Sequence, residues 1–124
     1  MPLQTPRISV STQITQCTSA VFSAALVDEN GDAVSQAALS FMNLTLKEYT
    51  TGIIINSRDA QDVFNANQVT VDNDGIVVWL SQPADNDMVL RDDKEYHVAR
   101  FEYETIGGKR GVTELNYIVR RRIA

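Results

Sequence analysis

The residue types that support nucleophilic or metal chemistry are sparse in this chain of 124 residues, which holds one histidine and one cysteine. Any histidine-based nucleophilic site would have to use His97. This residue shares a strand phase with Phe101 and Tyr103, so we expect a packed or half-exposed structural histidine. Cys17 has no second cysteine or nearby histidine at metal-ligand spacing, so we expect a buried, inert thiol. The sequence therefore predicts no catalytic, cofactor-binding or metal-binding residue, and no enzyme.

Acidic residues gather in two turns and one loop. Asp72 and Asp74 alternate as ligands do in calcium loops, but Ile76 and Pro83 stand where an EF-hand supplies a further oxygen and a bidentate Glu. Backbone hydrogen bonds to Asp and Asn explain this turn, and the turn at residues 28–32, as plain β-turns. We interpret a looser acidic cluster as a solvated face: Asp85, Asp87, Asp92, Asp93 and Glu95. Two acids could converge in space as a glycosidase pair, although no sequence feature indicates this.

Arg58 lies in a polar stretch, residues 57–67, beside Asp59 and Asp62. A bidentate arginine–carboxylate pair can pin a long connection to a scaffold. We expect this structural role for Arg58 rather than ligand binding.

The net charge of −5 disfavours binding of the whole domain to nucleic acid. Basic residues gather near the end of the chain, at Arg120, Arg121 and Arg122, which could meet an acidic partner or form a solvated terminus. The first residues lack a signal-peptide pattern, and no stretch approaches the length of a membrane span. A single cysteine precludes an internal disulfide and fits a reducing compartment. We therefore expect a soluble protein with no membrane partner.

The elements that must position these residues are predominantly β-strands. Alternating apolar residues, and the β-branched run at 53–55, predict strands at 8–14, 21–26, 39–49 with a bulge near Phe41 and Met42, 53–55, 69–71, 76–80, 95–104 and 112–119. Turns at Asn30-Gly31 and Gly75 separate them. This pattern predicts an all-β, immunoglobulin-like antiparallel β-sandwich of about seven strands, with Trp79 in its core. We divide the chain into an extended arm (1–7), the sandwich (8–119) and a basic tail (120–124).

A group of motifs in the last two-thirds of the chain carries a family resemblance. They are INSRD at 55–59, QDV at 61–63, Asn65, Asn67, VTVD at 69–72, Gly75, Trp79 and QPADN at 82–86, followed by HVA at 97–99 and FEY at 101–103. With these motifs the chain resembles small structural proteins of tailed bacteriophages. More loosely, it is similar to immunoglobulin-like domains of head-decorating, neck and baseplate upper proteins. These are scaffold motifs, so they carry over no catalytic residue.

The resemblance implies a non-enzymatic virion protein, made in the host cytoplasm and attached in many copies to the capsid surface or the head–tail (neck) region. Other virion proteins would be its partners. The residues expected to bind them lie in the two termini: Pro2, Pro6, Arg7, Arg120, Arg121 and Arg122. The alternative is a tail or baseplate module with a receptor- or carbohydrate-binding role, for which Tyr49, Tyr96 and Trp79 would be exposed stacking residues.

Overall fold

The computed structural model describes residues 13–28, 30–90 and 93–122. Within these ranges the chain forms strands β1 (Gln13–Thr15), β2 (Ala20–Ala25), β3 (Leu39–Glu48), β4 (Gln61–Asp62), β5 (Val69–Val71), β6 (Ile76–Ser81), β7 (Lys94–Thr105) and β8 (Arg110–Arg120), with two short 3₁₀ turns, η1 (Gln36–Ala38) and η2 (Pro83–Asn86). Of the strand predicted at residues 8–14, only residues 13 and 14 fall in the described part of the chain, and both belong to β1.

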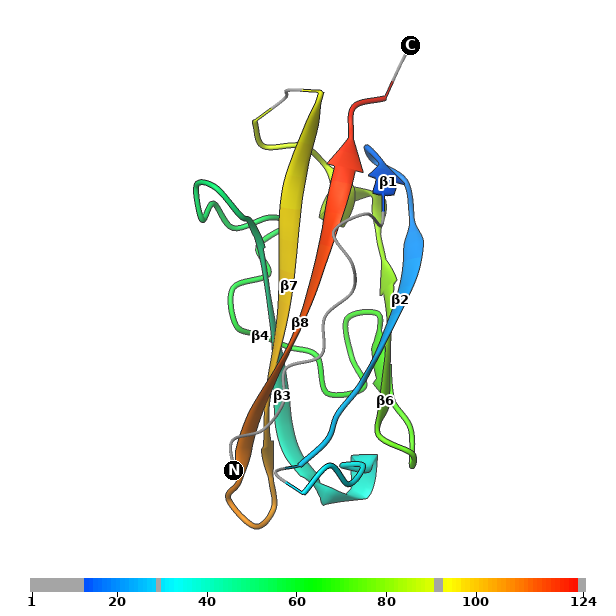
Figure 1. Ribbon diagram of the computed structural model, residues 1–124, viewed down its shortest axis with the longest axis vertical. Helices are drawn as coiled ribbons and strands as arrows, with labels where there is room; N and C mark the ends of the chain where they lie inside the picture. The colour runs from blue at the N-terminus through cyan, green and yellow to red at the C-terminus, as the bar shows by residue number, and fades with distance from the viewer. Residues whose placement is uncertain (1–12, 29, 91–92, 123–124) are drawn as a thin grey trace.

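Two sheets form the two layers of the molecule (Figure 1). One has the order β1-β8-β7-β3-β4, and the other has the order β2-β6-β5. All pairs are antiparallel except β1 with β8. In immunoglobulin nomenclature, β2 to β8 correspond to strands B, C, C′, D, E, F and G. The two sheets then have the orders G-F-C-C′ (with β1 beside G) and B-E-D, which are those of an immunoglobulin-like sandwich. The predicted fold class is therefore confirmed, with eight strands in the described residues.

The core lies between the sheets and is built by side-chain alternation. On β6, Val77 and Trp79 are buried while Val78 and Leu80 are exposed. Trp79 is fully buried and stacks on Phe22 of β2, with ring centroids 5.2 Å apart. The predicted core role of Trp79 is confirmed, and its alternative role as an exposed stacking residue is wrong.

The strand boundaries follow the local pattern closely. The register between β3 and β7 shifts between Leu39 and Phe41, so the bulge lies one to two residues earlier than predicted. The segment at residues 53–55 returns beside β3 as predicted, but it makes only one isolated bridge, between Lys47 and Ile54, instead of a regular strand. Gly31 and Gly75 have positive φ angles of 82° and 77°, which fits both predicted reversals.

Candidate functional site

A buried ion pair joins two loops that lie far apart in the sequence. Arg58 Nε is 2.5 Å from Asp85 Oδ1, and Arg58 Nη2 donates to Asp85 Oδ2 at 3.1 Å. Both side chains are almost fully buried, with exposed fractions of 2% and 0%. The guanidinium also lies 5.9 Å from the ring centroid of Trp79. The predicted pinning role of Arg58 is confirmed, but its carboxylate partner is Asp85 instead of Asp59 or Asp62.

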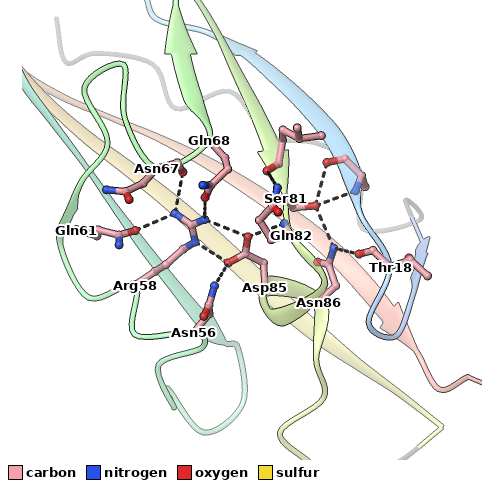
Figure 2. Close-up of polar contacts among 12 residues, drawn as sticks. Thr18, Asn56, Arg58, Gln61, Asn67, Gln68, Ser81, Gln82, Asp85 and Asn86 are labelled. Atoms are coloured by element: carbon pink, nitrogen blue, oxygen red, sulfur yellow. Dashed lines mark hydrogen bonds and ion pairs between the residues drawn. The ribbon is translucent and has the colours of Figure 1, made fainter.

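The remaining hydrogen-bonding capacity of this pair is filled by neighbouring polar groups (Figure 2). Arg58 also donates to the side chains of Gln61 and Gln68 and to the carbonyl oxygen of Asn67. Asp85 also accepts from the side chain of Asn56 and from the backbone N–H of Gln82. Because a buried charge is costly unless it is paired and hydrogen-bonded, this set of donors and acceptors makes the ion pair tolerable in the core.

The next residue, Asn86, anchors the opposite side of the same turn. Figure 2 shows Asp85 and Asn86 pointing in opposite directions from η2. Asn86 Nδ2 donates to the Thr18 carbonyl oxygen at 2.6 Å and to Ser81 Oγ at 3.0 Å. The backbone N–H of Cys17 donates to the Asn86 carbonyl oxygen at 2.9 Å. The turn at residues 83–86 therefore holds both the 56–68 loop and the connection between β1 and β2.

A second group of buried ionisable side chains lies on the inner face of the five-stranded sheet. Glu48 on β3 pairs across the ladder with His97 on β7, which pairs in turn with Tyr117 on β8. Glu95 lies two residues before His97 and has its carboxylate 2.6 Å from His97 Nε2. All four residues are at most 1% exposed. His97 is thus a packed structural histidine, as predicted.

Burial and hydrogen bonding shift the pKa values of Glu48, His97 and Tyr117. Desolvation lowers the pKa of His97 despite the opposing effect of Glu95, so the imidazole is neutral at pH 7 and Nε2–H donates to the carboxylate. Desolvation raises the pKa of Glu48, but donors from Thr50 and Thr51 outweigh it and the net pKa is lowered. Desolvation, helped by the charge of Asp85, raises the pKa of Tyr117 well above its usual value.

Three predictions about exposure are wrong. Asp85 and Glu95 were assigned to a solvated acidic face, yet both are buried as hydrogen-bond acceptors. Cys17 was expected to be buried, but it is exposed in a turn where its φ is 59°. Alternation could have identified Glu95, because it has the same strand parity as His97 and Ala99. The same signal could have found Glu48, which follows Leu44 and Leu46 in phase.

The acidic turns use their carboxylates locally. Asp28 Oδ1 accepts from the backbone N–H groups of Asn30 and Asp32, and Asp72 Oδ1 accepts from those of Asp74 and Ile76. These are the backbone hydrogen bonds that Asp makes in ordinary turns. Within residues 13–28, 30–90 and 93–122, no three His, Cys, Asp or Glu side chains are grouped as metal ligands.

The predicted partner-binding residues are only partly described. Arg120 ends β8 and donates from Nη1 to the Gln13 side chain at 3.0 Å, and Arg121 and Arg122 follow it, exposed. Pro2, Pro6 and Arg7 lie outside the described residues. Of the two predicted sets, only the carboxyl-terminal one can therefore be placed in the structure.

A pocket of about 290 Å³ lies at the other end of the sandwich, where the turn at residues 106–109 joins β7 to β8. Its lining includes Val34, Tyr103 and Arg110. Its lining does not include any residue of the Arg58 or His97 networks.

The described part of the chain contains no helix with the length and apolar character needed to cross a membrane. Neither a protein-family model nor a curated protein sequence matches this chain.

Proposed function

We propose that this chain is a non-enzymatic structural protein of a tailed-bacteriophage particle. It attaches to the capsid surface or the neck through its loops and termini, in several copies beside other virion proteins. It is made in the host cytoplasm and is located in the virion. The proposal rests on the motifs described above and on one structural observation.

That observation is the convergence of the resembling residues on one buried network. Seven residues from four separate motifs take part in the hydrogen bonds around η2: Asn56, Arg58, Gln61, Asn67, Gln82, Asp85 and Asn86. A network of this kind rigidifies long loops. Shared residues that serve a scaffold support a structural role better than an enzymatic one.

The basic carboxyl end is the proposed docking element. Arg120, Arg121 and Arg122 are all exposed, on a protein with a net charge of −5. A cationic patch of this kind favours an acidic neighbour and steers its association. The same negative net charge opposes an interaction with nucleic acid.

The test is incorporation into particles of a phage that encodes this sequence. Quantitative mass spectrometry of gradient-purified particles should detect the protein at a fixed number of copies per particle. This number should be a multiple of the rotational symmetry of the part of the particle to which the protein attaches. The variant with Arg120, Arg121 and Arg122 all changed to Glu should fold, yet be depleted from particles by tenfold or more. The control, Arg100→Glu with Arg110→Glu, changes two arginines elsewhere, of which Arg100 is half-buried and Arg110 is exposed. Absence of the protein from particles, or equal depletion by the control, contradicts the proposal.

A specific observation favours the alternative function, a tail or baseplate module with a receptor- or carbohydrate-binding role. Tyr49 and Tyr96 lie on neighbouring strand ends, joined by a hydrogen bond from Tyr49 N–H to the Tyr96 carbonyl oxygen at 2.8 Å. Their side chains are 69% and 37% exposed. Glu48 accepts from the backbone of Thr50 and Thr51, which fixes the turn that presents Tyr49. Exposed, rigidly held aromatic rings suit stacking on a sugar face.

Saccharide titration followed by NMR separates this alternative from the main proposal. If it holds, ring signals of Tyr49 and Tyr96 shift with a neutral oligosaccharide, and Tyr49→Ala abolishes the shift. Ile106→Ala, which truncates an exposed apolar residue at the other end, should leave the shift intact. An unchanged spectrum across a panel of host-surface glycans rejects the carbohydrate role.

A further inference from the structure

Two exposed tyrosines form one cross-strand row on the outer face of the five-stranded sheet. Glu48 pairs with His97 in the ladder between β3 and β7, and both side chains are buried on the inner face. The next pair joins Tyr49 to Tyr96, because the Tyr49 N–H donates to the Tyr96 carbonyl oxygen at 2.8 Å. Side-chain alternation therefore places both tyrosines on the outer face, where their exposed fractions are 69% and 37%.

Three basic side chains flank this row. Lys47 and Lys94 each lie two positions before one of the tyrosines, so alternation places them on the same face. Arg120 pairs with Lys94 in the ladder between β7 and β8. Lys94 and Arg120 are exposed, Lys47 is half-buried, and Lys94 Nζ lies 6.0 Å from the ring centroid of Tyr96. Because β3 and β8 end where β7 begins, these five residues gather at one end of the sheet and form an aromatic–basic patch (Figure 1).

The aromatic–basic patch has an excess of positive charge, unlike the rest of the outer face. Farther along the face, Arg100 pairs with Glu102 at 3.2 Å. Arg110 pairs with Glu104 at 3.0 Å. Among the described residues, no acidic side chain forms an ion pair with a basic member of the patch, and Asp93 is the only exposed acid within two positions of any member. Three cations together, on a chain with a net charge of −5, favour an anionic ligand.

The tyrosine row favours a saccharide over an acidic peptide. Aromatic rings stack on the apolar faces of sugar rings. The row is fixed before a ligand arrives, because the Glu48 carboxylate accepts from the backbone N–H groups of Thr50 and Thr51 in the turn that presents the first ring. In a uronic acid the carboxylate is attached directly to the sugar ring, so a stacked unit brings its charge beside Lys47 or Lys94. An acidic peptide would use the cations and leave the rings unmatched.

We propose that the aromatic–basic patch is a binding site for a saccharide that contains uronic acids. Tyr49 and Tyr96 stack on sugar rings, and Lys47, Lys94 and Arg120 bind the carboxylates. The inference names a ligand class for the carbohydrate-binding alternative and rests on that function, but it does not depend on a position in the virion.

NMR titrations of the full chain with two forms of the same saccharides test the site. The probes are tetrasaccharides of galacturonate and of mannuronate, and the matched ligands are the same molecules with every carboxylate methyl-esterified. The two forms share their rings and differ in charge. The acidic form should shift the ring signals of Tyr49 and Tyr96 and bind about tenfold or more tightly than the ester at low salt. This preference should shrink as sodium chloride is raised from about 50 mM to about 500 mM.

Three variants assign the effect. Lys47→Gln with Lys94→Gln removes two cations and should weaken binding of the acidic form by about tenfold or more, with the ester unaffected. Arg100→Gln with Arg110→Gln removes the same charge outside the patch and should bind as the wild type does. Tyr49→Ala should weaken binding of both forms. Should the double lysine variant not fold, Lys94→Gln alone gives the same comparison at an exposed position.

Each contrary result has its own meaning. Equal affinity for the acidic and esterified forms would overturn the uronic-acid assignment and leave the carbohydrate role standing. If neither form shifts the tyrosine signals, the proposal and the carbohydrate role both fail. A tetraglutamate peptide that binds as tightly as the acidic saccharides would show that the patch takes an acidic peptide, which also overturns the proposal. Equal weakening by the lysine and arginine double variants would remove the patch as the site.

Discussion

Asp85 and Arg58 form a two-pronged ion pair across a separation of 27 positions in the sequence. The carboxylate belongs to the short turn after β6, and the guanidinium belongs to the irregular loop between β3 and β5. Six non-glycine residues of residues 56–68 have positive φ angles: Asn56, Ser57, Ala60, Asn65, Asn67 and Gln68. Such backbone conformations persist only where surrounding contacts enforce them. The ion pair is the centre of those contacts.

A variant in which this pair is broken should therefore unfold at a much lower urea concentration than the wild type. Asp85→Asn leaves the Arg58 charge buried without a counter-charge, and we expect a loss of about 3–5 kcal/mol in the free energy of unfolding. Urea denaturation of the wild type and the variant measures it. Asp59→Asn, a matched change at an exposed carboxylate in the same loop, should cost less than about 0.5 kcal/mol. Equal costs for the two variants would contradict the assignment of Asp85 as the partner.

Two glycines in similar turns should respond differently to the same substitution. Gly31 and Gly75 each follow an Asp by three residues, and each donates its N–H to the carbonyl oxygen of that Asp. A Cβ on Gly75 would lie 2.8 Å from the Val34 carbonyl oxygen, whereas a Cβ on Gly31 would meet nothing within 4 Å. Gly31→Ala should cost about 1–2 kcal/mol for its positive φ. Gly75→Ala should cost about 1–3 kcal/mol more, because backbone must move.

Thermal or urea unfolding of both glycine variants gives this comparison directly. Since the φ angles differ by little, the difference between the two costs isolates the close approach at Gly75. If both variants lose the same stability, the tight contact between this turn and the β2–β3 connection is not as described.

Trp79 offers a spectroscopic measure of the core. It is the only tryptophan and is fully buried against Phe22 and Phe101. Its native fluorescence should be blue-shifted and resistant to iodide, and should shift to the red on unfolding. Trp79→Ala should cost about 3–5 kcal/mol, while Tyr49→Ala, at an exposed ring, should cost less than about 0.5 kcal/mol. Strong quenching of the native protein by iodide would show that Trp79 is accessible.

The sequence allowed the strands to be predicted, because their signal is local. Alternation alone located β2, the β5–β6 hairpin and the inner faces of β7 and β8, and the change of phase within residues 39–49 indicated the bulge in β3. The partner of Arg58 could not be predicted in this way. Nearby Asp59 and Asp62 look equally suitable, and the choice of Asp85 depends on how two loops meet in space. Local acidity also suggested a solvated Glu95, although strand parity places it inside.

Glu48 should make the free energy of unfolding depend on pH in the acidic range. Its folded-state pKa is lowered because the donors of Thr50 and Thr51 outweigh desolvation, so the ionised form stabilises the fold. This contribution is fully present above the unfolded value of about 4.5 and is lost as the pH falls through the folded pKa. Glu48→Gln should therefore cost about 1–3 kcal/mol at pH 7, since a neutral amide accepts these donors less strongly.

Urea unfolding at a series of pH values from 7 to 3 tests this sign. The wild-type and Glu48→Gln curves should converge as the pH falls below 4.5, because a protonated Glu48 has lost the same advantage. Glu102→Gln, on the solvent side of β7 with its side chain 51% exposed, serves as the matched control and should follow the wild type within about 0.5 kcal/mol. A constant offset between wild type and Glu48→Gln at every pH would mean that the carboxylate acts through its shape and not its charge.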